Sequence, residues 1–353
     1  MRLPCFFIAL AIFASAGVYG EAKDAPNIGD LRDQISTHYS PLAHSNELSP
    51  RVVSPTEWDR LQRFQAERGV KLKAQTVDLA AERFDLYVPA TMPEAGYAVL
   101  VFIPPAPEWP VPRDWKMPLD RTGIIYVAAQ TSGNQQNVLD RRMPLALHAL
   151  ELVQQRYAVN KQRVYIGGFS GGSRVAMRLA RAFPDVFAGA LLIAGSDPLG
   201  IRGSIIPSAK LMQRFQTHSR IVFVTGQNDL PNRAQDEKTR ASFSAYCVAG
   251  ARTHLQPRLD HWIPDRRGFT TAIKSLFEEV VPGAEHPTCL QALRDRVEHA
   301  LDEVESLMKS GAIEAAGVKL GEIDDLYGGL AAERSVPMAL RLSALRGASG
   351  EVK

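Results

Sequence analysis

The chain has 353 residues, of which 45% are hydrophobic and 22% are charged, and its formal net charge is +3. This length allows one large α/β domain with extensions or two ordinary domains. Lysines and arginines are interspersed with aspartates and glutamates along the chain, which argues against a nucleic-acid-binding protein.

Residues 1–20 differ in composition from the rest of the chain. Arg2 gives a positive start, residues 3–18 are almost wholly apolar or small, and small-x-small patterns occur at Ala14-Ser15-Ala16 and Val18-Tyr19-Gly20. This pattern predicts a cleaved signal peptide and a secreted or periplasmic protein, with no stable membrane insertion after cleavage. The alternative is an uncleaved membrane anchor, although the apolar run is shorter than the roughly 20 residues that span a bilayer.

Residues 21–70 are expected to form an N-terminal arm and a helix. The chain up to residue 55 is polar and interrupted by prolines, which favours an extended path over the surface. Residues 56–69 then show a helical pattern, with Thr56 as a candidate N-cap and Gly69 as its end.

Residues 71–283 alternate between strand and helix patterns. Short apolar segments typical of strands occur at 83–88, 98–103, 123–129, 163–169, 188–195, 220–225 and 253–259. Helical patterns lie between or after several of them, at 139–157, 172–183 and 267–281. The alternation predicts an α/β fold in which helices cover both faces of a mostly parallel sheet.

Residues 284–353 are expected to form a small all-helical extension. Amphipathic patterns occur at 290–309, 312–327 and 335–345. The extension has no cluster of residues typical of catalysis, which favours a cap or packing element; a docking surface for a partner is the alternative.

Two cysteines, Cys247 and Cys289, follow the predicted signal peptide. In an oxidising compartment they can form one disulfide that ties the extension to the core, whereas two buried free thiols are the alternative. Neither cysteine has zinc-site spacing with a histidine, so no metal is expected.

The segment Gly168-Phe169-Ser170-Gly171-Gly172 matches G-x-S-x-G between a predicted strand and a predicted helix. A sharp turn of this kind strains the serine backbone and exposes its Oγ, and the flanking glycines avoid collisions. The N–H of Gly171 at the helix start would face a developing oxyanion. The pattern predicts Ser170 as a nucleophile; a tight structural turn is the alternative.

A serine nucleophile needs a base and an acid, which follow it in the order acid, histidine in this kind of fold. His261 comes just after the strand pattern at 253–259, at the sheet edge where ligands bind. Asp229 follows the strand pattern at 220–225 in the same way. Asp197 is the alternative acid, and a cap or turn role is the alternative for Asp229. The other later histidines lie in a strand pattern (His254), a connector (His286) and a charged helix (His299).

Three segments resemble the polyhydroxybutyrate-depolymerase-like and feruloyl-esterase-like branch of the α/β-hydrolase superfamily. "RVYIGGFSGGSRVAMRLARAFPDVFAGALLIAG" resembles its nucleophile region, and "VTGQNDLPNRAQ" and "DHWIPDRRGFTTAIKSLF" resemble its acid and histidine regions. The resemblance covers about residues 83–281. It implies an α/β-hydrolase fold in which Ser170, Asp229 and His261 match the catalytic triad.

One loop departs from that resemblance. Many members carry a His-Gly-Gly-type stretch after an early strand, where a backbone amide completes the oxyanion hole. Here the place is occupied by Ile103-Pro104-Pro105-Ala106-Pro107-Glu108. Because prolines have no N–H, the second donor must come from Ala106, from Glu108 or from a side chain. Losing one such donor costs about 3–4 kcal/mol of transition-state stabilisation.

Several other residues are candidates for substrate contact. Trp109, Trp115 and Trp262 are candidates to line an apolar cleft, and Trp262 directly follows His261; packing is the alternative role for each. Asn134, in the loop after the strand at 123–129, is a candidate for binding a polar substrate group.

Together these patterns predict a secreted serine hydrolase that cleaves carboxylic esters through an acyl-enzyme and needs no cofactor. The expected partner is a small-molecule or polymeric ester. The alternatives are a peptidase or acyltransferase with the same triad, and a catalytically inactive binding protein of the same fold.

Overall fold

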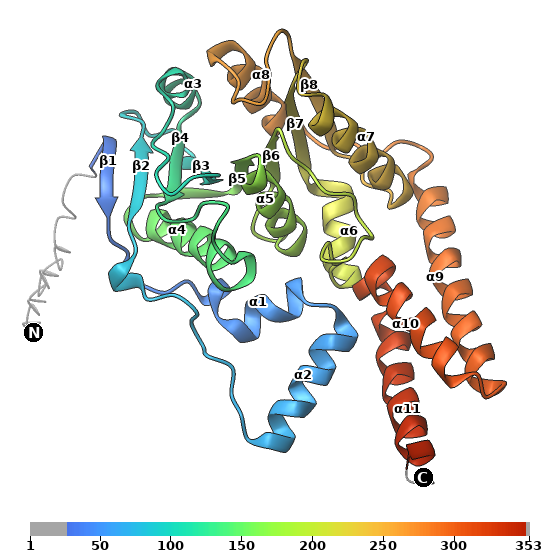
Figure 1. Cartoon of the computed structure of the whole chain (residues 1–353). Coiled ribbons are helices and arrows are strands. Elements are labelled where there is room, and N and C mark those ends of the chain that lie inside the picture. Colours follow the sequence, from blue (N-terminus) through green and yellow to red (C-terminus); the bar gives the residue numbers. More distant parts are fainter. Residues whose placement is uncertain (1–26, 351–353) are drawn as a thin grey trace, which may run out of the picture.

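The computed structural model describes residues 27–350, with side chains to residue 346. The predicted signal peptide at 1–20 therefore lies outside the described residues. Within the described range, a sheet of eight strands has helices on both faces and is followed by a group of helices at the C-terminal end (Figure 1). The predicted α/β fold, a mostly parallel sheet with helices on both faces and a helical extension at the C-terminal end, is confirmed.

The strand order in the sheet is β1-β2-β4-β3-β5-β6-β7-β8. Strand β2 is antiparallel to both of its neighbours, and all pairs from β4 to β8 are parallel. Seven strands lie close to the predicted segments: β2 (Phe84–Val88), β3 (Tyr97–Ile103), β4 (Ile124–Ala129), β5 (Val159–Phe169), β6 (Gly189–Ile193), β7 (Arg220–Gly226) and β8 (Ala251–Gln256). Because β4 to β8 are parallel, their carboxyl ends meet at one edge of the sheet.

Strand β1 (Gly29–Gln34) comes from the segment that the sequence placed in an extended arm. It pairs antiparallel with β2 at the edge of the sheet, with Gly29 opposite Val88 and Leu31 opposite Leu86. Its sequence, GDLRDQ, carries three charges, so its hydrophobicity does not indicate a strand. An edge strand tolerates this composition because only one of its sides is paired.

The helices include both expected and unexpected ones. Those that match predicted patterns are α2 (Pro55–Arg68), α4 (Met143–Arg156), α5 (Gly171–Ala182), α8 (Arg266–Phe277), α9 (His286–Lys309), α10 (Ile313–Tyr327) and α11 (Ala332–Gly350). Those that the sequence patterns did not indicate are α1 (Ser45–Val52), α3 (Arg113–Thr122), α6 (Ala209–His218) and α7 (Leu230–Ala245). Shorter helical turns are η1 (Pro41–Ala43), η2 (Leu79–Ala81), η3 (Val138–Arg142) and η4 (Gly328–Leu330).

Alternation along β3 divides the core into two layers. Val99, Val101 and Ile103 face the layer that contains α4, α5 and α6. Leu100 and Phe102 face the opposite layer, which contains α3 and α8. Both faces of the strand are buried, which is the pattern of a parallel sheet covered on both sides.

Trp115, a candidate for lining an apolar cleft, lies instead in the core. Its side chain is 0% exposed, and its ring stacks on Phe269 of α8 with centroids 4.0 Å apart. Its Nε1 donates a hydrogen bond to the Pro264 carbonyl oxygen at 3.0 Å. Packing between α3 and α8 therefore explains why a tryptophan occupies this position.

The C-terminal helices α9, α10 and α11 share a small core of their own. Its members include Leu301 and Val304 of α9, Leu320 and Ile323 of α10, and Leu342 of α11. Thr56 of α2 donates to Asp324 of α10 at 2.6 Å. The extension thus packs against the N-terminal helix α2 as well as on itself. The division of the chain into residues 21–70, 71–283 and 284–353 remains a prediction.

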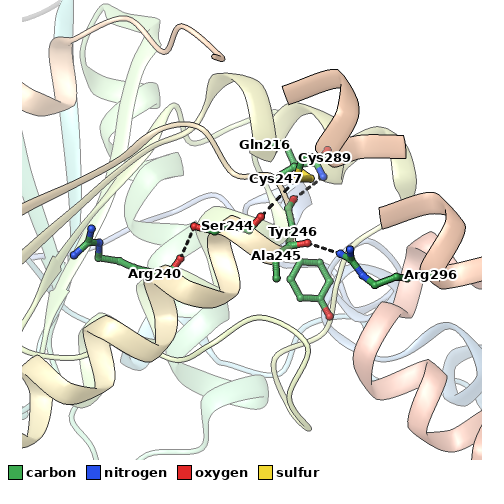
Figure 2. Close-up of a disulfide and its surroundings, with 8 residues drawn as sticks. All are labelled: Gln216, Arg240, Ser244, Ala245, Tyr246, Cys247, Cys289 and Arg296. Carbon is green, nitrogen blue, oxygen red and sulfur yellow. Dashed lines mark hydrogen bonds between the residues drawn. A yellow bond between two sulfur atoms is a disulfide. The ribbon is translucent and has the colours of Figure 1, made fainter. Parts of the chain in front are cut away.

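A disulfide between Cys247 and Cys289 joins the end of α7 to the first turn of α9 (Figure 2). Beside it, Arg296 of α9 donates to the Ala245 carbonyl oxygen at 2.7 Å. Of the two alternatives left open by the sequence, the structure has the disulfide. It closes a loop across the junction between the sheet region and the helical extension, so it limits separation of the two parts.

His148 of α4 is 0% exposed, and its Nδ1 accepts a hydrogen bond from the Ser40 N–H at 3.0 Å. Burial lowers the pKa of His148 from 6.5 to about 4. Because the folded chain keeps this ring neutral where the unfolded chain protonates it, its contribution to stability is full above pH 6.5 and is lost as the pH falls towards 4. We expect a loss of roughly 2 to 3 kcal/mol over this window.

Urea unfolding of the wild type and of His148→Gln at about pH 7 and about pH 4.5 measures this contribution. The glutamine can accept the Ser40 hydrogen bond but does not titrate. The stability of the wild type should fall more steeply than that of the variant. Parallel losses in the two proteins would contradict the prediction.

Candidate active site

The turn between β5 and α5 holds Ser170 in a strained conformation. Its φ is 55° and its ψ is −120°, a region that non-glycine residues rarely occupy. A Cβ built on Gly172 would lie 1.9 Å from the Ile103 carbonyl oxygen, and one on Gly168 would lie 2.4 Å from the Gly172 carbonyl carbon. Glycine is therefore required on both sides of the serine, as the motif predicts.

The structure brings the three predicted triad residues together. Nε2 of His261 lies 3.0 Å from Ser170 Oγ, and Nδ1 of the same ring lies 2.7 Å from Asp229 Oδ2. Asp229 follows β7, and His261 lies between β8 and α8, so both approach Ser170 from the carboxyl-terminal edge of the sheet. In the tautomer that suits a general base, Nδ1–H donates to the carboxylate and Nε2 accepts from the hydroxyl.

The carboxylate of Asp229 is 5% exposed and is held by a residue that the sequence patterns did not indicate. The amide nitrogen of Asn232 donates to both Asp229 oxygens, at 3.0 and 2.9 Å, and lies 3.1 Å from His261 Nδ1. Asp229 precedes α7 without capping it through its side chain, which leaves its carboxylate turned to His261. If the sequence had predicted a helix that begins after Asp229, Asn232 would have been a candidate partner of Asp229, because it lies about one helical turn further along.

The alternative acid, Asp197, and two of the other later histidines, His254 and His299, have other partners. Asp197 lies 3.4 Å from Arg178 and 3.6 Å from Arg174. His254 Nε2 lies 3.0 Å from Ser275 Oγ, and His299 lies 3.3 Å from Glu303 on the surface of α9. Asp229 and His261 therefore remain the pair that reaches Ser170.

Gly171, a candidate oxyanion donor, lies beside Asn134 at the start of α5. As the first residue of α5, Gly171 has an N–H without an intrahelical partner. The carboxamide of Asn134 lies against it, since a Cβ built on Gly171 would be 2.4 Å from Asn134 Oδ1. The Asn134 N–H donates to the Pro105 carbonyl oxygen at 2.8 Å, which joins its loop to the proline-rich loop that contains Ala106.

Aromatic rings form an apolar wall beside the triad. The Phe169 ring lies 4.9 Å from the His261 ring and 5.9 Å from the rings of both Trp109 and Trp262. Trp262 is 56% exposed. It is therefore open to a solute next to His261.

Among the described residues, no group of three or more histidine, cysteine, aspartate or glutamate side chains is arranged to hold a metal ion. Within the same residues, we find no helix with the length and apolar character needed to cross a bilayer.

No protein-family model and no curated protein matches the chain. Its fold is similar to those of solved esterases. A thermostable esterase aligns at 16% identity over 57% of this chain and 60% of its own, with a TM-score of 0.43. The feruloyl esterase module from Clostridium thermocellum aligns at 13% identity over 57% of this chain and 85% of its own, with a TM-score of 0.45. The acetyl xylan esterase from Aspergillus awamori aligns at 12% identity over 56% and 94%, with a TM-score of 0.42.

Proposed function

We propose that this chain is a serine hydrolase that cleaves carboxylic esters through an acyl-enzyme. The observation that carries the proposal is the placement of the His261 ring, 3.0 Å from Ser170 Oγ on one side and 2.7 Å from Asp229 Oδ2 on the other. A base placed in this way can take the serine proton, and the carboxylate stabilises the imidazolium that results.

In the proposed reaction, Ser170 Oγ attacks the ester carbonyl carbon while His261 Nε2 takes its proton. The oxyanion that forms faces the N–H of Gly171, beside which the Asn134 carboxamide lies, and the Ala106 N–H is the proposed second backbone donor. His261 then gives the proton to the leaving alcohol, which leaves an acyl group on Ser170. Water deprotonated by His261 attacks the acyl-enzyme, the carboxylic acid departs, and Ser170 regains its proton.

The exposed ring of Trp262 is proposed to contact the apolar part of the substrate. It shares the aromatic wall with Phe169 and Trp109, beside the base. A flat apolar surface of this kind suits an aliphatic or aromatic group.

A fluorophosphonate probe tests the proposed nucleophile. The wild type should become labelled at Ser170, and Ser170→Ala should not become labelled, because the probe needs an activated hydroxyl. Ser244→Ala, at an exposed position of α7, is a matched control that should be labelled like the wild type. Labelling of Ser170→Ala at the wild-type rate, or no labelling of the folded wild type, would overturn the proposal and favour an inactive binding protein.

A matched ester and amide with the same acyl group separate an esterase from a peptidase. We expect turnover of the ester to exceed that of the amide, and alcohol acceptors to give little transfer product. Faster cleavage of the amide would favour a peptidase, and dominant transfer to alcohols would favour an acyltransferase.

We further propose that residues 1–20 direct export and are then removed. The disulfide between Cys247 and Cys289 supports an oxidising destination. Mass spectrometry of the exported protein should show that residues 1–20 are absent. An intact N-terminus would contradict cleavage.

A further inference from the structure

Helix α5, which begins directly after Ser170, carries three arginines on one face. Arg174, Arg178 and Arg181 have the i, i+4, i+7 spacing that aligns side chains along a helix. A fourth arginine, Arg142 of η3, reaches the start of the same helix, with a nitrogen 3.5 Å from the Gly171 carbonyl oxygen. Four guanidinium groups thus gather along the helix that presents the nucleophile.

The carboxylates near these arginines do not balance their charge. In the described part of the chain, Asp197 is the one carboxylate within ion-pair distance of any of the four, at 3.6 Å from Arg174 and 3.4 Å from Arg178. Asp236, which lies close enough to Arg174 to be influenced by its charge, is instead bonded to the hydroxyls of Ser196 and Thr225. The cluster therefore holds an excess of positive charge.

Two of these arginines also have unused donors. The Nε atoms of Arg178 and Arg181 are buried, and neither has a hydrogen-bond partner among the described residues. Arg181 is 3% exposed, and its Nη1 donates to Ser204 Oγ at 2.7 Å. A buried donor without a partner costs about 1 to 3 kcal/mol, so the cluster has capacity for a further acceptor.

The charges in the cluster act on one another. Burial, followed by the charge of Arg178, lowers the pKa of Arg142 to about 10 and that of Arg181 to about 9. Both groups remain protonated near neutral pH. An anion placed among them would relieve this repulsion.

The cluster is connected to the triad at both ends of the nucleophile turn. Arg174 donates to Asn232 Oδ1 at 3.4 Å, and Asn232 in turn holds Asp229. On the other side, Arg142 donates to the carbonyl oxygens of Pro104 at 3.0 Å and Ser132 at 2.9 Å. The positive charge therefore lies against the loops that surround Ser170.

Part of the cluster is accessible to a solute. The side chains of Arg174 and Arg178 are 42% and 30% exposed. At 1.5 Å of rise per residue, they lie about 6 and 12 Å along α5 from Ser170. A group on a substrate bound at Ser170 can span this distance with a short chain.

We propose that Arg174 and Arg178 form an anion subsite and that the preferred substrates are esters that carry a carboxylate on a short arm beyond the scissile bond. Guanidinium groups suit this ligand because their planar fork matches the two carboxylate oxygens. Arg142 and Arg181 lie behind the subsite and add to its positive potential. The inference rests on the proposed esterase function and specifies its substrate class.

Two substrates that differ by one methyl group and by their charge test the subsite: para-nitrophenyl hydrogen suberate, which is anionic at neutral pH, and para-nitrophenyl methyl suberate, which is neutral. We expect the wild type to favour the anionic ester by roughly tenfold or more in kcat/KM. This preference should weaken as ionic strength rises, because both arginines are partly exposed. A wild-type ratio near one would overturn the inference while leaving the esterase function in place.

Arg174→Gln and Arg178→Gln should each lower the ratio of the two kcat/KM values several-fold, and Arg174→Lys should retain more of it than Arg174→Gln. Arg121→Gln, at an exposed position of α3 on the opposite face of the sheet, is the matched control and should keep the wild-type ratio. If the variants slow both esters equally, the arginines serve the fold or the oxyanion rather than substrate charge, and the inference is wrong. If the wild type hydrolyses neither ester, the proposed function itself fails, and the inference with it.

Discussion

His261→Ala should lower kcat for ester hydrolysis by roughly 10⁴- to 10⁶-fold, because the serine hydroxyl then has no base to take its proton. Neutral serine is a poor nucleophile, and the ring lies 3.0 Å from Ser170 Oγ. Steady-state kinetics with a para-nitrophenyl ester measure the change. The His261 side chain is 44% exposed, so the variant should remain folded.

The matched control for this variant is His299→Ala. His299 lies on α9 with 79% of its side chain exposed, and it contacts Glu303 rather than the triad. Its replacement should leave kcat and KM unchanged within about twofold. If His261→Ala retained turnover within tenfold of the wild type and circular dichroism showed both proteins folded, His261 would have to be removed from the proposed mechanism.

Asp229→Asn should lower kcat by about 10⁴-fold with a smaller change in KM. The carboxylate accepts from His261 Nδ1–H at 2.7 Å, which keeps Nε2 free to accept the serine proton. An asparagine at this place can donate to Nδ1 and so favour the opposite ring tautomer. The Asn232 amide, which donates to both Asp229 oxygens, would also lose part of its acceptor.

Asp260→Asn is the control for the assignment of the acid. Asp260 is exposed and adjacent to His261 in sequence, yet it accepts from Trp262 N–H through its backbone oxygen. Its variant should turn over substrate at close to the wild-type rate. If Asp260→Asn lowered kcat by about 10⁴-fold and Asp229→Asn lowered it only slightly, the assignment of Asp229 as the acid would be wrong.

The elements around Ser170 could be predicted from the sequence because their signals are local. The second half of β5 is apolar, the glycines that flank Ser170 allow its strained turn, and α5 has a clear apolar face. Asp229 and His261 could be proposed because each follows a strand, and the carboxyl ends of parallel strands meet at one edge of the sheet. Their contact with Ser170 is a tertiary distance that no local pattern contains.

The elements that the sequence patterns missed have weak hydrophobic signals. Helix α7 buries only Asp236, Thr239 and Phe243, so its polar sequence shows no apolar face. Helix α3 contains Pro118 and five charged residues, although Trp115 anchors it in the core. Both helices are stabilised by the rest of the fold, and tertiary packing often outweighs local propensity in this way.

The sequence by itself determined the alternating strands and helices, the glycine-flanked serine and the order of the acid and the base, since these depend on periodicity and on backbone sterics. Only the tertiary structure decided which aspartate faces His261, whether Cys247 and Cys289 pair, and where Trp115 lies. It also gathered Arg142 with the arginines of α5. These outcomes depend on contacts between segments far apart in the chain, and such contacts form only when the sheet brings those segments together.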